Sequence, residues 1–326
     1  MPATTSSDVS PGARSATFAG PCFIVLNAGS GKQDAETRRE IITRVFDAAG
    51  RRCEILPIDR STPIERVATA AVARAKAERG AVIAAGGDGT INAVAQAVYG
   101  HGLPFGVIPL GTFNYFARVH GIAQDVEAAT RALLRARIEP AQAGRAGGHL
   151  FLVNASLGLY PQLLEDREAF KQQFGRSRLV ALWSGLLTLA RQSRQLHLTI
   201  EAGDQKATLR TPTLVVVNNR LQLERLGFPE ADALAQGQLA GIVIKPIGTL
   251  SMFGLLLRGV LGRLGDAENV QHLPFRRVTV SPRGRRRIKL AMDGEIRWVP
   301  TPVVFEVAPE PLSLLVPAPE DRVEVA

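Results

Sequence analysis

The pattern of hydrophobic and polar positions changes character near residue 137. Before that point, short apolar runs alternate with longer segments whose apolar residues recur at helical spacing. The apolar runs predict strands at 23–26, 53–58, 81–85 and 105–108, and the segments between them predict helices at 34–49, 63–79, 90–99 and 124–136. Strands that alternate with helices pair in parallel, so this part of the chain predicts an α/β domain with a doubly wound sheet.

After residue 137 the apolar runs are short and carry β character. They predict strands at 150–156, 195–201, 206–210, 213–218, 239–244, 276–281, 287–292, 296–299, 303–307 and 312–316, with helical patterns at 161–173, 178–192 and 251–262. Many short strands separated by turn residues predict a β-rich antiparallel sandwich. We therefore expect four parts: a disordered tail over 1–19, the α/β domain over 20–137, the β-rich domain over 138–318 and a tail over 319–326.

Composition narrows the class of protein. The chain has 326 residues, of which 46% are hydrophobic and 21% charged, as is typical of soluble globular proteins. Its longest apolar stretch, 179–190, is shorter than the roughly 20 residues that span a bilayer. Cys22 and Cys53 form no CxxC pair, which argues against a disulfide framework or a zinc site. We expect a cytoplasmic protein, and the net charge of +9 favours anionic partners.

Three loops rich in Gly, Ser, Thr and Asn leave the carboxyl ends of predicted strands, at 27–32, 86–90 and 109–114. Ligands of open parallel sheets bind at this edge. Glycine lets successive backbone N–H groups face an anion, and the helix after residue 90 would add the positive end of its dipole. The loops therefore predict a phosphate-binding site.

Simpler or more familiar explanations of these loops fit less well. A plain strand-to-helix turn with Thr90 as its N-cap would need one glycine, and this turn has three. A Walker loop ending at Lys32 would need glycine and Ser/Thr where Leu26 and Gln33 stand. The dinucleotide pattern GxGxxG does not follow the first strand.

Three segments carry a resemblance to a known family: "GGDGTIN" (86–92), "GVIPLGTFNYFAR" (106–118) and "DGE" (293–295). Together they resemble the diacylglycerol kinase catalytic family, in its bacterial lipid kinase branch, which is related to sphingosine and ceramide kinases. GGDGT alone also occurs in NAD kinases and phosphofructokinases. The combination with "FLVNASLGLY" (151–160) and "DGEIRWVPTPVVFEVAPEPLSLLVP" is more specific, and the resemblance spans about residues 20–317.

The resemblance implies transfer of the γ-phosphoryl group of ATP to a lipid hydroxyl, with Mg²⁺. It implies Glu295 as proton acceptor, Asp293 as its close support, and Asp88 as organiser of a metal or of water at the phosphates. The residues implied in nucleotide binding are Asn27, Ser30, Gly31, Gly86, Gly87, Asp88, Gly89, Thr90, Ile91, Asn92, Thr112 and Asn114. Two local alternatives stay open: Asp88 could simply accept backbone N–H bonds, and Asp293-Gly294 also fits a hairpin turn.

The chain departs from the family pattern in three places. Tyr115 follows Asn114 where the branch often has aspartate, and Gln236-Gly237 stands where an Asp-Gly pair often helps to hold a structural Mg²⁺. Asp232 lies four residues before Gln236, and 215–227 lacks a glycine cluster. The metal ligands are therefore unknown, and we expect a single Mg²⁺ that arrives with ATP.

The resemblance also implies a lipid substrate at a membrane surface, with peripheral contact at the inner membrane, and it allows a homodimer. The segment 249–265 fits either an interfacial amphipathic helix or a core helix. The run 275–289 holds seven cations and fits either a solvated hairpin or a surface for anionic headgroups. Its one aromatic residue, Phe275, gives no interleaved stacking platform, so we expect no nucleic acid partner.

Three functions remain open at this stage. An ATP-dependent lipid kinase explains all three motifs, and a NAD kinase explains GGDGT. A non-catalytic module that binds nucleotide or lipid explains the departures at Tyr115 and Gln236.

Overall fold

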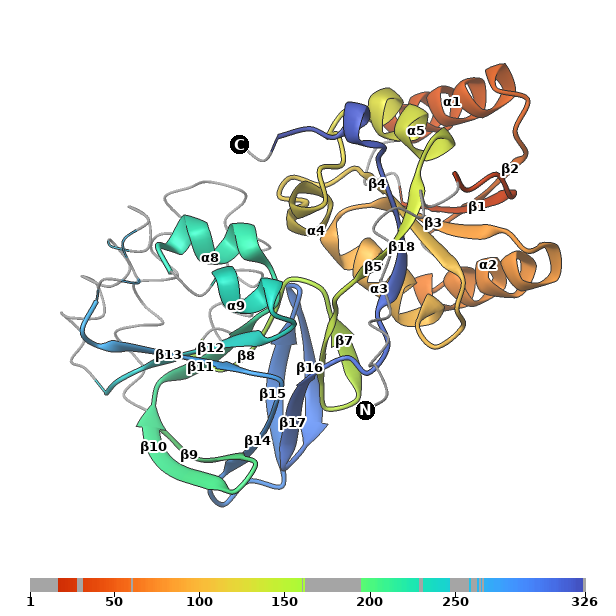
Figure 1. Cartoon of the computed structure of the whole chain (residues 1–326). Coiled ribbons are helices and arrows are strands. Elements are labelled where there is room, and N and C mark those ends of the chain that lie inside the picture. Colours follow the sequence, from red (N-terminus) through yellow and green to blue (C-terminus); the bar gives the residue numbers. More distant parts are fainter. Residues whose placement is uncertain are drawn as a thin grey trace, which may run out of the picture.

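The computed structural model has two lobes, and the chain passes between them at residues 142–143 and 308–311 (Figure 1). It describes residues 17–27, 32–59, 61–159, 161, 195–228, 231–246, 258, 263, 265 and 267–324. The loop 28–31, the helix predicted at 178–192 and nearly all of those predicted at 161–173 and 251–262 lie outside the described residues. Within them, no helix is both long and apolar enough to cross a membrane.

The first lobe is built on a six-stranded sheet of order β2-β1-β3-β4-β18-β5. Its strands are β1 (Cys22–Leu26), β2 (Cys53–Pro57), β3 (Ala81–Gly86), β4 (Pro104–Pro109), β5 (Arg137–Ala141) and β18 (Leu312–Val316). All neighbours pair in parallel except β5, which runs antiparallel to β18. β3 is buried along its whole length, as expected of a parallel strand covered on both faces.

Helices cover both faces of this sheet. Helices α1 (Lys32–Ala48) and α5 (Val126–Leu134) lie together on one face, and α2 (Ile64–Glu78) and α3 (Asp88–Val98) lie on the other (Figure 1). The short helix α4 (Tyr115–Val119) follows β4 at the edge that faces the second lobe. This arrangement confirms the predicted doubly wound α/β domain.

The second lobe is a sandwich of two antiparallel sheets, of order β10-β9-β14-β17-β6-β7 and β13-β12-β11-β8-β15-β16. Its strands are β6 (Gly144–Ala146), β7 (His149–Phe151), β8 (Asn154–Gly158), β9 (Leu196–Ala202), β10 (Gln205–Thr211), β11 (Thr213–Val217), β12 (Leu239–Ile244), β13 (Val270–Phe275), β14 (Arg277–Pro282), β15 (Arg287–Met292), β16 (Glu295–Pro300) and β17 (Val303–Val307). Phe151 and Phe305 of one sheet and Leu290 of the other share one buried cluster. The predicted β-rich antiparallel sandwich is confirmed.

The last strand of the chain does not follow the expected division between domains. β18 lies in 138–318, which the sequence assigned to the β-rich domain, yet it pairs with β4 and β5 in the first sheet. Leu314 of β18 is fully buried there. The apolar run "LSLLV" suits either sheet, and its partners lie about 200 residues away, so spacing along the chain gives no sign of this return.

Smaller differences concern where elements begin and end. The run predicted as one strand at 150–156 is two strands, β7 and β8, with a break at Leu152 and Val153. Helix α3 begins at Asp88 with Gly87 as its N-cap, so Thr90 lies inside the first turn rather than at the cap. The short helices α8 (Arg220–Leu226) and α9 (Ala231–Ala235) and the 3₁₀ turn Pro319–Asp321 were not predicted.

Candidate active site

Two of the glycine loops meet at the carboxyl edge of the first sheet. A Cβ atom at Gly111 would lie 2.7 Å from the Cα atom of Gly87, so position 111 needs glycine for the loops to touch. At Gly86 a Cβ would lie 2.5 Å from the side chain of Thr90, which is buried against it. The Oγ1 atom of Thr90 in turn accepts a hydrogen bond of 2.9 Å from Asn27, at the end of β1. Asn27 at the end of β1 and the loops after β3 and β4 therefore lie against one another at this edge.

Asn114 holds the shape of the loop after β4. Its backbone is left-handed, with φ of 49°, a conformation that asparagine tolerates better than most residues. Its side-chain oxygen accepts from Gly111 N at 3.0 Å, and its amide donates to Gly111 O at 2.9 Å and to Gln124 at 2.8 Å. Asn114 therefore closes the loop on itself and is 97% buried.

Asp88 lies at the start of α3 and faces the start of α4. Its Oδ2 atom accepts a hydrogen bond of 3.0 Å from the backbone N–H of Asn114. Burial raises the pKa of Asp88, against the opposite effect of backbone N–H groups at 114–116. Its Oδ1 atom is buried and has no hydrogen-bond partner among the described residues. The carboxylate thus has one oxygen bonded to the loop and a second, buried oxygen whose bonding capacity these residues leave unused.

Glu295 reaches the same place from the second lobe. It stands at the start of β16, and a Cβ atom at Gly89 would lie 3.6 Å from its Oε1 atom. Its Oε2 atom accepts a hydrogen bond of 3.0 Å from Arg297, while 46% of the side chain stays exposed. The geometry therefore places a solvent-accessible carboxylate of one lobe above the first turn of α3 in the other, although 200 residues separate them.

Asp293, expected to support catalysis closely, has a different environment. Its Oδ1 atom accepts hydrogen bonds from Val153 N and Asn154 N, and its Oδ2 atom from Leu152 N and from Asn92 Nδ2, at 2.7–3.0 Å. Burial raises the pKa of Asp293 to about 6, against the opposite effect of these four donors. These hydrogen bonds link Asp293, at the tip of the β15–β16 hairpin, to the turn between β7 and β8 and to Asn92 of α3.

The other residues implied in nucleotide binding divide into three groups. Asn92 donates to Leu150 O and Asp293 and so joins α3 to the second lobe, and Ile91 is fully buried in the first core. Thr112 is exposed on the loop after β4. Ser30 and Gly31 lie outside the described residues. The structure therefore brings together Asn27, the 86–90 loop, Asn114 and Glu295, while the packing of Ile91 and Asn92 gives them structural roles.

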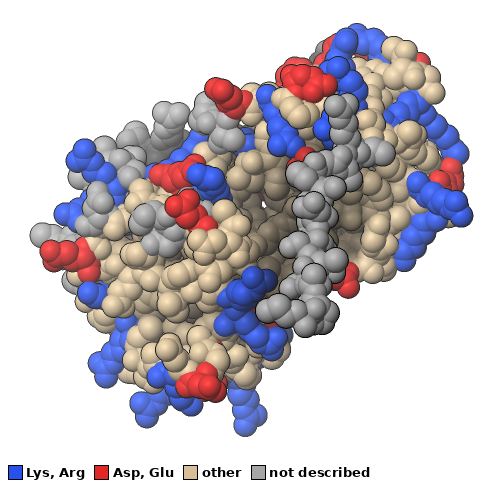
Figure 2. Space-filling model, in the orientation of Figure 1, with Lys and Arg blue, Asp and Glu red and all other residues tan. Residues whose placement is uncertain are grey.

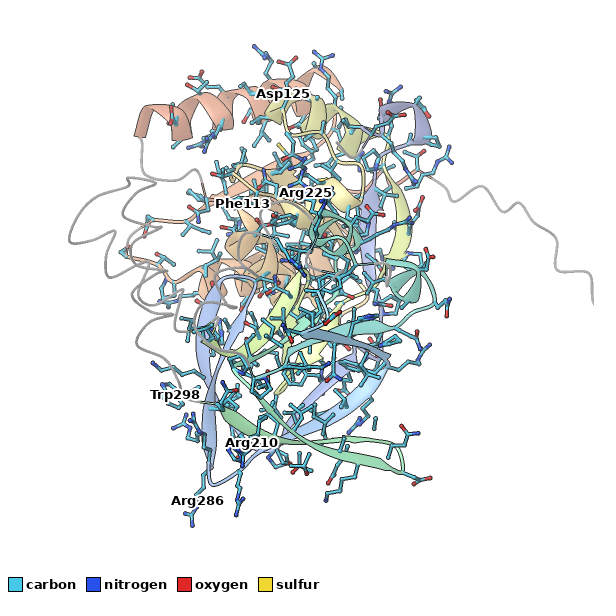
Figure 3. The ribbon with its side chains drawn as sticks, turned by 90° about the vertical axis from the view of Figure 1, so that its left-hand side faces the viewer. Phe113, Asp125, Arg210, Arg225, Arg286 and Trp298 are labelled. Atoms are coloured by element: carbon cyan, nitrogen blue, oxygen red, sulfur yellow. The ribbon has the colours of Figure 1, made fainter. Side chains whose placement is uncertain are left out.

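A contact between the lobes beside this site was not predicted. Tyr115, where the family often has aspartate, stacks on Phe113 with ring centroids 5.9 Å apart, and Arg225 of α8 lies 5.8 Å from its ring centroid (Figure 3). Its backbone oxygen accepts a hydrogen bond of 3.1 Å from Asn219, the N-cap of α8. An aromatic–cation contact between lobes thus stands where a carboxylate was expected. The sequence marks this position through the departure from the family pattern at Tyr115, but it gives no sign that Arg225 is the partner of the ring.

The described residues at the second departure are not grouped as metal ligands. Gln236 and Asp232 are both exposed near α9. Across the described part of the chain, no group of three or more His, Cys, Asp or Glu side chains is arranged to hold a metal ion. Beside the glycine loops, Oδ1 of Asp88 is a carboxylate oxygen without a partner among the described residues.

Residues 21–146 match the family model of the diacylglycerol kinase catalytic domain. This part of the chain, well under half of its length, is therefore similar to that domain. The matched residues contain the glycine loops and Asp88, and they end at the first strand pair of the second lobe. Glu295 lies beyond the matched residues.

Longer comparisons cover both lobes. The chain is 28% identical to a Staphylococcus haemolyticus protein named "putative lipid kinase", over 71% of this chain and 74% of that protein. It is also 28% identical to an uncharacterized Synechocystis protein, over 72% of this chain but only about half (54%) of that one. A diacylglycerol kinase structure from Bacillus anthracis str. Sterne matches 93% of this chain and 98% of its own, with a TM-score of 0.65 and 18% identity. That likeness shows the shared two-lobed fold.

Proposed function

We propose that the protein is an ATP-dependent lipid kinase that transfers the γ-phosphoryl group to a lipid hydroxyl, of diacylglycerol or sphingoid type. One observation carries the proposal: the carboxylate of Glu295 lies above Gly89, at the N-terminus of α3. Phosphoryl transfer needs an anion cradle and a proton acceptor within reach of one another. The contact between the DGE hairpin and the GGDGT loop meets that need.

The cradle for the phosphates is the first turn of α3 with the two loops beside it. Backbone N–H groups at a helix N-terminus bind anions, and the absence of Cβ atoms at 87, 89 and 111 leaves room for a close approach. Asp88 fits a Mg²⁺ ion through its Oδ1 atom, which has no hydrogen-bond partner among the described residues. Bound there, Mg²⁺ would neutralise negative charge that develops on the phosphate oxygens. Asn27 and Asn114 shape the two sides of this cradle.

Glu295 would act on the acceptor. Its Oε1 atom takes the proton of the lipid hydroxyl, whose oxygen then forms the new bond to the γ-phosphorus as the bond from that phosphorus to the β–γ bridging oxygen breaks. ADP leaves with the bridging oxygen, and Glu295 later returns its proton to water. Arg297, bonded to Oε2, fixes the carboxylate so that Oε1 faces the cradle.

The test is ATP-dependent phosphate transfer to mixed-micelle lipids, measured in parallel with NAD as acceptor. We expect transfer to lipid by the wild type and a loss of at least about a hundredfold in Glu295→Gln, because the amide cannot accept the proton. Glu201→Gln is the matched control. Glu201 is also a strand carboxylate of the second lobe, 42% exposed and paired with one cation, Lys206.

Other outcomes separate the remaining functions. Transfer to NAD rather than lipid would make the protein a NAD kinase. Binding of ATP without transfer to any acceptor would identify a non-catalytic module, in which the contact at Tyr115 has replaced a catalytic carboxylate. Equal activity of Glu295→Gln and Glu201→Gln would remove Glu295 from the mechanism.

A further inference from the structure

One end of the second-lobe sandwich gathers arginines around the turn that joins β14 to β15. We call this surface the arginine end, and it consists of Arg210, Arg283, Arg285, Arg286 and Arg287. All five are exposed. The turn is tight, with Gly284 at a φ of 70°. It carries the chain from one sheet of the sandwich to the other, so its side chains project from the end of the lobe.

The fold adds to this surface residues that the sequence separates. Arg283 N donates to His197 O at 2.9 Å, which attaches the turn to β9. Arg210 pairs with His197 across β9 and β10, which brings a fifth guanidinium to the same end. In Figure 3 the labelled Arg210 and Arg286 both lie at the lower end of this lobe, and Figure 2 shows blue side chains projecting there.

These guanidinium groups have no ion pair within the described residues, unlike other cations of the lobe. Glu306 accepts from Arg277 at 2.6 Å and lies 3.4 Å from Arg145, and Glu201 pairs with Lys206. Glu201 and Glu306 are thus paired with other cations, and the arginine end keeps a local excess of positive charge. Such a surface complements a dense array of anions.

A large aromatic side chain is exposed on the neighbouring strand. Trp298 of the edge strand β16 is 57% exposed, and the Nζ atom of Lys289 lies 5.4 Å from its ring centroid. Exposed tryptophan beside cations is typical of the membrane–water interface, where the ring sits at headgroup level. Trp298 also lies on the lower part of the lobe (Figure 3).

A cavity opens within the arginine end. Its volume is about 330 Å³, and its lining comprises Gln195, Leu196, His197, Pro282, Arg283 and Arg285. Two guanidinium-bearing residues and an imidazole at one small cavity suit a single phosphate-bearing headgroup. A nucleic acid strand, in contrast, would call for a longer basic groove with several aromatic platforms.

We propose that the arginine end and Trp298 dock the protein on anionic lipid bilayers. The hairpin β15–β16 connects this surface to the candidate active site. Arg287 pairs with Pro300 at one end of β16, and Glu295 stands at the other, about 17 Å away at 3.3–3.4 Å per residue. The inference goes beyond the proposed function, because docking requires no phosphate transfer.

The test compares binding to vesicles of phosphatidylcholine alone with vesicles that also contain phosphatidylglycerol. We expect sedimentation only with the anionic vesicles, and release by raised salt. The triple variant Arg283→Gln/Arg285→Gln/Arg286→Gln should lose roughly a hundredfold in partition coefficient. The triple variant Arg39→Gln/Arg66→Gln/Lys76→Gln, in exposed positions of the first lobe, lowers the net charge equally and should bind like the wild type.

Fluorescence gives an independent readout. The chain has two tryptophans, so a Trp183→Phe background leaves Trp298 as the only one. We expect its emission to shift to the blue on addition of anionic vesicles. Equal loss in both triple variants, no shift of Trp298, or tighter binding of a short duplex DNA than of anionic vesicles would each overturn the proposal.

A micelle assay keeps this test apart from the kinase test. The triple variant of the arginine end should phosphorylate lipid presented in neutral mixed micelles at the wild-type rate, because its substitutions lie about one strand length from Glu295. If the wild type is no kinase at all, vesicle binding by the arginine end can still hold or fail by itself.

Discussion

At the scale of single residues, the glycines of the candidate site have different reasons to be glycine. Gly86 and Gly111 are enclosed, because an added Cβ atom would lie too close to Thr90 or to the opposing loop. Gly89 is open: the nearest atom to an added Cβ would be Oε1 of Glu295, at an ordinary contact distance of 3.6 Å. The fold therefore does not require glycine at 89, whereas the proposed ligand would.

Gly89→Ala should separate stability from function. Alanine is better than glycine in a helix by up to about 1 kcal/mol, so the free energy of unfolding should stay level or rise. The new methyl group would occupy the space between the first turn of α3 and Glu295, and we expect phosphate transfer to fall at least about tenfold. Urea unfolding and steady-state kinetics on the same preparation measure both quantities.

Gly111→Ala provides the comparison. Its Cβ would lie 2.7 Å from the Cα atom of Gly87, so it should lose about 1–3 kcal/mol of stability as well as activity. Unchanged transfer by Gly89→Ala would argue against phosphates at the start of α3.

At the scale of elements, β18 completes the first sheet from the far end of the chain. It lies between β4 and β5, and without it β4 would have an unpaired edge. Leu312, Leu314 and Leu315 of this strand are all buried in the core of the first lobe. The C-terminal strand is therefore structural for the lobe that holds the glycine loops.

Leu314→Ala should destabilise the protein by about 2–5 kcal/mol, because it removes buried methyl groups from a fully enclosed site. Leu273→Ala is the matched control, since Leu273 is 48% exposed on β13 and should change stability by less than about 0.5 kcal/mol. Chemical unfolding followed by circular dichroism measures both. A loss below about 1 kcal/mol for Leu314→Ala would mean that β18 contributes little to the first lobe.

At the scale of the whole molecule, Asp293 joins three parts of the structure. Asn92 donates to it from the first lobe, and the turn between β7 and β8 donates from the second, while the residue itself forms the tip of the β15–β16 hairpin. Tyr115 and Asn219 make a second connection between the lobes. These contacts fix the position of Glu295 relative to α3.

The titration of Asp293 should make stability depend on pH in a defined way. Its pKa is about 6 in the folded protein, against an ordinary value of 3.8. Between these values the folded protein holds a proton that the unfolded chain has released, so the free energy of unfolding falls as pH rises from about 4 to 6. The full effect is about 3 kcal/mol, and it levels off above pH 6.

Asp293→Asn cannot titrate and should lack this component. Urea unfolding between pH 4 and 8 gives the free energy of unfolding of both proteins. The difference between the two free energies should change between pH 4 and 6 and stay constant above pH 6. Parallel curves over the whole range would mean that Asp293 titrates alike in the folded and unfolded states.

Much of the fold follows from patterns along the chain. Buried parallel strands are continuous apolar runs, and the helices between them show a separate periodicity, so β1 to β4 and α1, α2 and α3 lie close to their predicted ranges. The two residues of the Asp293-Gly294 turn both have positive φ, as the predicted hairpin needs. The prediction failed for short or interrupted elements such as β7 and β8, because a few residues show no clear hydrophobic period.

The sequence by itself determined the elements, the loops at the carboxyl edge and the candidate carboxylates, because these depend on local periodicity and on residue type. Only the tertiary structure decided what surrounds each carboxylate. Asp293 and Glu295 are two residues apart in one motif, yet one is enclosed by four N–H donors and the other faces the glycine loop. Those donors and that loop lie about 140 to 200 residues away, and contacts over such distances leave no periodic signal in a single sequence.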